Sequence, residues 1–190
     1  DLRPCDLGVT LLTREPVMDS IWHPMLNSLI MASVSILLTP LVSIVLGIWT
    51  ALKPGGRVDG IVSGTTLFTY SMPDFVVANV FIIVFALSLG WAPAVLMVAE
   101  SAPWHQILAV SVLPVLALIA SGVAYQFRLL RAGMVDALAS EFVERARLSG
   151  LPDWRLVIVH ALPVALIPML NGTAQFVAGI ISGTVVIEAV

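Results

Sequence analysis

The sequence predicts an all-α integral membrane protein, a bundle of transmembrane helices with a short helix on its cytoplasmic side. Of the 190 residues, 59% are hydrophobic and 11% are charged, and the mean hydropathy is +1.03. Water-soluble domains carry roughly 25% charged residues, so this composition excludes a soluble globule and predicts contact with a lipid bilayer. Long apolar runs predict helices, whereas the alternating ten-residue pattern of membrane strands does not occur in the sequence.

Four apolar runs predict four membrane-spanning helices. They cover residues 25–52, 61–89, 107–127 and 157–187. Each is long enough to cross ~30 Å of hydrocarbon at about 1.5 Å per residue. The chain begins without an initiator methionine and stops at Val190 inside an apolar run, so we expect a fragment cut at both ends.

Glycine pairs suggest where these helices approach one another. Gly60 and Gly64 are four residues apart, and so are Gly179 and Gly183. This spacing lets two helix backbones come close in a membrane. The other interpretation, left open here, is that glycine is simply common in membrane helices.

The lysine and arginine residues predict the orientation of the chain. Seven of the nine follow the first run or lie between the third and the fourth. Because such residues concentrate in cytoplasmic loops, loops 53–60 and 128–156 are predicted to be cytoplasmic. Residues 1–24 and 90–106 are then external. We divide the chain into this external segment, 1–24, and a transmembrane domain, 25–190.

Residues 136–163 form the longest charged island in the chain. Asp136 is a plausible N-cap for a short amphipathic helix that extends to Ser149, since Leu138 and Phe142 recur at helical spacing between charges.

A glycine and a proline predict a sharp corner after this helix. Gly150 is expected to stop it in a left-handed conformation, and Pro152 prevents its continuation. A second helix is expected to begin near Asp153 and to lead into the last apolar run.

This island carries a family resemblance. Glu144-Arg145-Ala146, then Gly150 after three residues, then His160-Ala161-Leu162-Pro163 after nine more, resembles the EAA loop of binding-protein-dependent ABC importer permeases. Arg145 and His160 depart from the general pattern. The variant is similar to the dipeptide, oligopeptide and nickel branch of that family, and we expect His160 to pack or to bond a carbonyl group.

The resemblance implies a subunit of about six spans in the inner membrane of a bacterial or archaeal cell. It implies three kinds of partner: a second homologous permease, two ATP-binding subunits and an external solute-binding protein. The chain would carry a small solute, most simply peptides. ATP would be bound and hydrolysed by a partner, so the chain itself would be no enzyme and hold no cofactor. The expected contacts with the ATPase are Leu138, Phe142, Glu144, Arg145, Ala146, Arg147 and Gly150.

Asp74 lies near the middle of the second run, after Pro73. A carboxylate there costs roughly 2.5–3.5 kcal/mol on insertion scales, so such groups usually face a bundle interior or an aqueous path. Proline leaves a backbone carbonyl unpaired, which suits a bend that lines a cavity. We hypothesise that Asp74 borders the solute path. The alternative is a structural aspartate that is protonated, hydrogen-bonded or closer to the interface.

Three further residues are candidates for the path. Asn171 and Gln175, four residues apart, could present amides to one face, and are as well suited to bond a neighbouring helix. Glu188 resembles a glutamate near the outer end of the penultimate span in the same branch.

Other functions have less support. An ion-coupled secondary transporter or channel that uses Asp74 is the alternative function, and it would need no ATPase. The three histidines are too scattered for a metal site. No nucleophile elbow occurs, the only lysine, Lys53, is not in a phosphate-binding loop, and nothing suggests a nucleic-acid partner. The sequence does not identify the solute.

Overall fold

The computed structural model describes residues 8–9, 16–92 and 111–188, and this part of the chain is helical apart from turns and an isolated bridge between Val9 and Pro16. The predicted all-α fold is confirmed. The elements are α1 (Val17–Ala51), α2 (Arg57–Tyr70), α3 (Asp74–Phe81), the π-helix η1 (Ile82–Ser88), α5 (Val112–Leu138), α6 (Glu141–Leu148), α7 (Asp153–Arg155), the π-helix η2 (Leu156–Ala161) and α8 (Leu162–Glu188).

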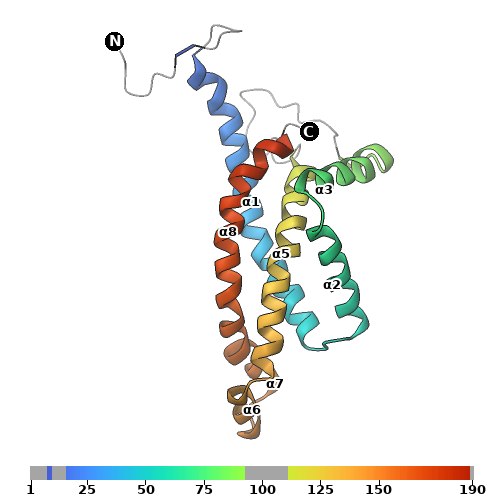
Figure 1. The fold of residues 1–190 in the computed structure, drawn as a ribbon, viewed down its shortest axis with the longest axis vertical. Coiled ribbons are helices and arrows are strands. Elements are labelled where there is room, and N and C mark those ends of the chain that lie inside the picture. The colour runs from blue at the N-terminus through green and yellow to red at the C-terminus, as the bar shows by residue number, and fades with distance from the viewer. Residues whose placement is uncertain (1–7, 10–15, 93–110, 189–190) are drawn as a thin grey trace.

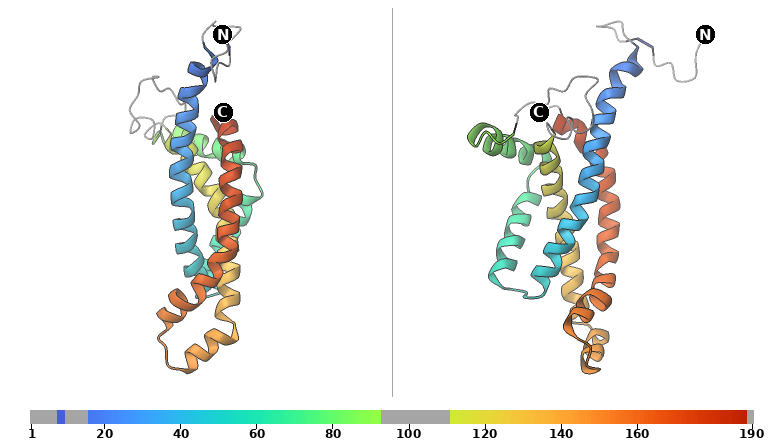
Figure 2. Two further views of the ribbon diagram at one scale, coloured as in Figure 1. Left: turned by 90° about the vertical axis from the view of Figure 1, so that its left-hand side faces the viewer. Right: turned by 180° about the vertical axis from the view of Figure 1, so that it is seen from behind.

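Three long helices, α1, α5 and α8, lie side by side and form the body of the structure (Figure 1). The central helix is α5, which also packs against α2 and α3. In Figure 2, α2 stands beside this body, α3 lies across one end of it, and α6 and α7 lie at the opposite end. The turn between α1 and α2 is at the α6 end (Figure 1), so the two loops predicted to share one side of the membrane do lie at one end of the bundle.

Within the described residues, three helical stretches are long and apolar enough to span a membrane: Met25–Ala51, Val112–Leu138 and Asp153–Ile180. The predicted second span is bent. Arg57–Tyr70 and Asp74–Ser88 meet at an angle of 112° and together form either a fourth, broken span or a re-entrant loop, with the bend at the predicted Pro73. Pro73 explains the break, because its ring cannot follow a preceding helical turn and it has no amide hydrogen to donate. Asp74 is therefore the first residue of α3 at a bend, not a residue in mid-helix.

The third span extends further than predicted. The apolar run was expected to end at residue 127, yet α5 continues to Leu138. Leu130, Met134 and Ala137 are buried at helical spacing. They pack into one core cluster with residues of α1, η2 and α8. The charged residues Arg128 and Arg131 had suggested that the helix ends at residue 127. Burial of this face keeps the chain helical beyond them, because most helical stability in a protein comes from tertiary packing.

This extension corrects the start of the amphipathic helix. Asp136 lies in the last turn of α5 and is not an N-cap. The chain breaks at Ala139 and Ser140, and the short helix α6 begins at Glu141. The Ser140 hydroxyl donates to the carbonyl of Ala137 and so satisfies the end of α5. The amphipathic helix is eight residues long.

Four of the residues that α1 buries carry hydroxyl groups, beside the apolar Met31, Ala32 and Ala51. Ser35, Thr39 and Ser43 are fully buried, and Thr50 is 1% exposed. The Ser35 and Ser43 hydroxyls donate to carbonyls one turn earlier, at 2.9 and 2.8 Å. Small side chains that satisfy themselves on their own helix allow a second helix to approach closely in a membrane. The helix begins at Val17, ahead of the apolar run and across the division drawn after residue 24.

The close helix contacts are not at the predicted glycines. Nothing lies within 4 Å of a Cβ built at Gly60, Gly64 or Gly179, and the surroundings of Gly183 lie outside the described residues. A Cβ at Gly133, however, would be 3.0 Å from the Cα of Ala165. Glycine at that position lets the backbones of α5 and α8 touch.

We predict that Gly133→Val destabilises the protein by about 1–3 kcal/mol, the usual cost of overpacking, because the backbone of α8 must move to admit the side chain. The matched control is Gly64→Val, which has open space around it. Thermal unfolding of the detergent-solubilised protein measures both variants. Equal midpoints for the two would contradict the assigned contact between α5 and α8.

Candidate functional site

The end of α6 is a complete helix stop. Gly150 has φ +80°, the left-handed conformation predicted for it. Its amide donates to the Arg147 carbonyl at 3.0 Å, and the Leu151 amide donates to the Ala146 carbonyl at 3.3 Å. These two bonds are the Schellman arrangement, in which a left-handed residue satisfies the last carbonyls of a helix. Since Gly150 adopts it without strain, the chain reverses sharply here.

The chain then re-enters a helix as predicted, because α7 begins at Asp153 after Pro152. The helix continues through the π-turns of η2 into α8. In η2, the Nδ1 of His160 is 3.1 Å from the carbonyl oxygen of Arg155, five residues earlier. The expectation that His160 bonds a carbonyl is thus met by the π-helix.

The charged residues of α6 are exposed and paired along the helix. Arg145 is 3.2 Å from Glu141, and Arg147 is 3.2 Å from Glu144. Exposed pairs of this kind contribute at most about 0.5 kcal/mol to a helix, so these side chains can exchange partners at little cost. Four of the eight residues of α6 are charged.

Apolar residues fix α6 on one side and leave it open on the other. Val143 is fully buried and anchors the helix, whereas Phe142 is 44% and Leu148 79% exposed. Ala146 is half-buried. Leu138 was predicted to lie on the short amphipathic helix, but it belongs to α5, where it packs against the core cluster. A hollow of about 550 Å³ between the end of α5 and α6 is lined by Leu138, Ala139, Glu141, Glu144, Arg145 and Arg147.

An ion pair that the sequence analysis missed joins α2 to α5. The carboxylate of Asp59, 4% exposed, accepts hydrogen bonds from Arg131 Nε at 2.5 Å and Nη2 at 2.6 Å. It also accepts from the Gly55 amide at 2.8 Å and the Ser63 hydroxyl at 3.1 Å. Asp59 had been assigned to the loop 53–60, just before the second apolar run. Arg131 had been assigned to a loop, so no partner was expected.

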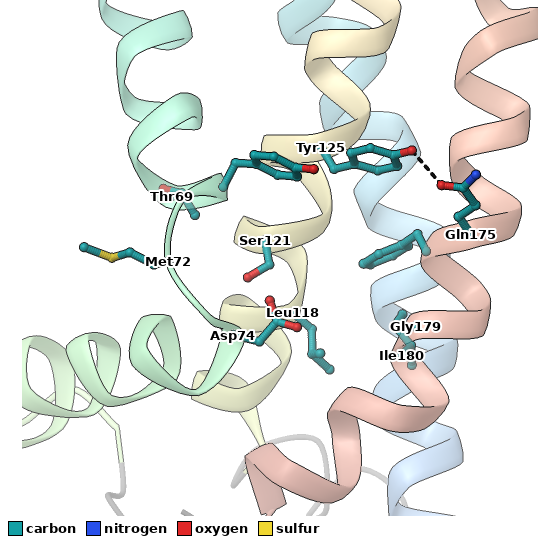
Figure 3. A pocket seen from close by; sticks show the side chains of 11 residues that line it. Thr69, Met72, Asp74, Leu118, Ser121, Tyr125, Gln175, Gly179 and Ile180 are labelled. Carbon is teal, nitrogen blue, oxygen red and sulfur yellow. Dashed lines mark hydrogen bonds between the residues drawn. The ribbon is translucent and has the colours of Figure 1, made fainter.

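A cavity of about 370 Å³ lies between α2, α5 and α8, beside the bend before α3. Val77 and Ala78 of α3 pack against Ala117 and Leu118 of α5, and this contact fixes the start of α3. As a result, Asp74 and Ser121 extend into the same part of the cavity (Figure 3). The Oγ of Ser121 is buried without a hydrogen-bond partner.

Two tyrosines close the cavity on the side toward the middle of the bundle. Tyr70 of α2 and Tyr125 of α5 are stacked, with centroids 5.9 Å apart and an interplanar angle of 14°. The Tyr125 hydroxyl donates to Gln175 Oε1 of α8 at 2.9 Å (Figure 3). The Arg128 guanidinium lies 5.2 Å from the Tyr70 centroid. There is a second cavity, of about 720 Å³. Of the residues that line the two cavities, only Tyr70 and Tyr125 line both.

The structure therefore brings together two of the four predicted path residues. Asp74 and Gln175 line the same cavity. Asn171 is exposed on α8 and does not line it. Glu188 ends α8, and its side chain lies outside what the structure describes. Tyr70, Tyr125 and Ser121 were missed because aromatic and hydroxyl residues are common in membrane helices and carry no spacing signal.

Comparisons with known proteins agree with the resemblance in residues 136–163. Residues 43–190 match the family of binding-protein-dependent transport system inner membrane components. The chain is 34% identical over 161 residues to the oligopeptide transport system permease protein OppB of Salmonella typhimurium, covering 84% of this chain and 50% of that protein. It is 31% identical over 156 residues to the dipeptide transport system permease protein DppB of Bacillus subtilis, covering 82% and 48%. The chain thus spans about half the length of the curated relatives it matches.

We predict that Arg131→Leu costs about 3–5 kcal/mol of stability, because it leaves the buried Asp59 carboxylate without its counter-ion. The double variant Asp59→Asn/Arg131→Leu should recover much of this loss, since no buried charge remains. Thermal unfolding of the solubilised transporter compares the two variants. If the double variant is as unstable as Arg131→Leu, then Arg131 does not stabilise the protein through its ion pair with Asp59.

Proposed function

The chain belongs to the family of binding-protein-dependent transport system inner membrane components, and we propose that it is a permease subunit of an ATP-driven ABC importer of peptides. The family match is the observation that carries this proposal, and it describes a multi-pass inner membrane protein whose transport depends on a binding protein. Peptides are proposed as the solute because the similar proteins are named for oligopeptide and dipeptide transport.

The proposed partners follow from the family. A second homologous permease would complete the path, two ATP-binding subunits would supply energy from the cytoplasm, and a solute-binding protein would deliver peptides from outside. ATP would be bound on the partner subunits, with no cofactor held by this chain. The match to a binding-protein-dependent family favours this function over the ion-coupled alternative.

We assign coupling to α6. Its charged residues are exposed, and they form ion pairs only with one another within α6. Phe142 and Leu148 leave apolar surface beside them. Such a surface suits a groove in an ATPase, with the charges orienting the helix and the apolar side chains filling the groove. Leu138, Glu144, Arg145 and Arg147 would contribute through the hollow that they line, and Ala146 would allow close approach.

Movement of α6 would reach both neighbouring spans. The Gly150 stop and the buried Val143 hold α6 against the ends of α5 and η2. A partner that binds α6 differently in two nucleotide states can therefore shift the equilibrium between two positions of α5 and α8. The difference between the two binding free energies sets the size of that shift in equilibrium. The cavity that contains Asp74 and Gln175 lies between these same spans and is our proposed segment of the solute path. Asn171 is not part of this proposal, and Glu188 stays a prediction.

The energy source separates the proposed function from its alternative. We expect proteoliposomes with the complete transporter to take up tri-alanine only with ATP inside and the binding protein outside, and to ignore a protonophore. A variant transporter whose ATPase subunits cannot hydrolyse ATP is the control. Uptake that persists in this control and stops with the protonophore would favour the ion-coupled transporter.

We predict that Phe142→Asp lowers peptide-dependent ATP hydrolysis at least about tenfold, because it places a charge where an apolar contact is expected. The matched control, Phe68→Asp, alters an exposed phenylalanine on α2, 65% exposed, away from α6. Cysteine crosslinking from Glu144→Cys to the ATPase gives a second readout. Full ATPase coupling in Phe142→Asp, or no crosslink in any nucleotide state, would contradict docking through α6.

A further inference from the structure

The cavity beside the α2–α3 bend contains a carboxylate without a counter-ion. Asp74 is the one carboxylate among the residues that line it. No ion pair or hydrogen bond joins the Asp74 side chain to another side chain in the described ranges. The two arginines of α5 are engaged elsewhere, since Arg131 pairs with Asp59 and Arg128 lies against Tyr70. Asp74 is exposed at the bend and lines the cavity, so a cation that enters the cavity can pair with its carboxylate.

The other polar groups of the cavity also suit a hydrogen-bond donor. The buried Ser121 Oγ has no partner and can accept a bond. The Gln175 Oε1 already accepts from Tyr125 and has a second lone pair. Aromatic side chains of Tyr70, Tyr125 and Phe176 complete the lining, and aromatic rings tolerate cations and repel anions. Asp74 and Ser121 lie in the same part of the cavity, and Gln175 lies at its tyrosine side (Figure 3). Carboxylate, hydroxyl and carbonyl oxygens lining one cavity match an ammonium group, which offers three donors and accepts none.

The size and closure of the cavity limit what it can hold. About 370 Å³ is within the range of small-molecule sites, about 300–1,000 Å³, and too small for a folded partner. The stacked tyrosines separate it from the second cavity, with which it shares no other lining residue. A group that enters from the α3 end would therefore stop at the tyrosine pair.

We propose that this cavity binds the positively charged amino group of the transported solute, with Asp74 as its counter-ion and Ser121 and Gln175 as acceptors. The inference rests on the proposed function, and for a peptide the group is its free amino terminus. The amino end would enter the cavity first, and the tyrosine pair would hold it until α2 and α5 separate. Asp74 then selects solutes by charge at the permease itself.

Cysteine labelling tests the charge preference in the complete transporter. Cys5 is the single cysteine of the 190 residues, so Ser121→Cys reports on the cavity in a background in which Cys5 and all cysteines elsewhere in the transporter are replaced by serine. We expect a cationic methanethiosulfonate to react faster than an anionic one by about tenfold or more, corrected for their intrinsic rates. Asp74→Asn should abolish this preference and Asp74→Glu should keep it. Trp91→Cys, 73% exposed and outside the cavity, is the reference position. A preference that survives Asp74→Asn would overturn the proposal.

Protection by solute tests the ligand class. Tri-alanine should slow labelling of Ser121→Cys severalfold, and N-acetyl-tri-alanine should not. Met72→Cys, which lines the same cavity, repeats the measurement if Ser121→Cys fails to assemble. Protection by both peptides, or by neither in a transporter that imports tri-alanine, would overturn the amino-group assignment and leave peptide import standing. Failure of ATP-dependent uptake would instead count against the proposed function, whatever the labelling preference.

Discussion

The ion pair between Asp59 and Arg131 is the interaction on which the arrangement of the path depends. Among its fourteen residues, α2 buries only Asp59 and Thr66, so hydrophobic packing holds this helix weakly. Four donors converge on the Asp59 carboxylate, two of them from Arg131 on α5. In a membrane the rest of α2 gains little by packing on protein instead of lipid, because both surroundings are apolar. The charge pair therefore decides where α2 sits, and with it the bend and the start of α3.

The central helix α5 connects the two functional regions. It carries Ser121 and Tyr125 in the cavity, Arg131 at the ion pair, and Leu138 beside α6. Tyr125 and Leu138 are separated by about 20 Å along the helix axis at about 1.5 Å per residue. Under the proposed coupling, a shift of α6 would reach the tyrosine pair through α5, while the partner tyrosine, Tyr70, is held by α2.

The two ends of the described bundle differ in what they offer a partner. At the α6 end, ion pairs run along the helix surface and are open to exchange. At the α3 end, a small cavity presents one carboxylate and several acceptor oxygens. An exposed, exchangeable surface suits a protein that binds and releases in each cycle, whereas a small cavity lined by acceptor oxygens suits a small cationic group. The charge pattern is therefore consistent with the different partners proposed for the two ends.

The sequence by itself determined the features that single residues impose on their own backbone. Composition decided the membrane class, Gly150 and Pro152 decided the corner after α6, and the spacing from Glu144 to Pro163 identified the family. Pro73 predicted a bend, but the sequence did not predict the angle between the two helices. These signals are local, since a left-handed glycine or a missing amide hydrogen acts within a few residues.

Only the tertiary structure decided which helix faces meet. The burial of Leu130 and Met134 carried α5 past its first charges, and the Asp59–Arg131 pair joined residues far apart in the chain. The predicted Gly60–Gly64 pair makes no close helix contact, whereas the hydroxyl residues of α1, which were not predicted, are buried, because small residues permit close approach without specifying a partner. In a membrane chain the apolar pattern does not distinguish a surface that faces lipid from one that faces protein. The cavity around Asp74 depends on which helix surfaces face protein, so the sequence alone could not predict it.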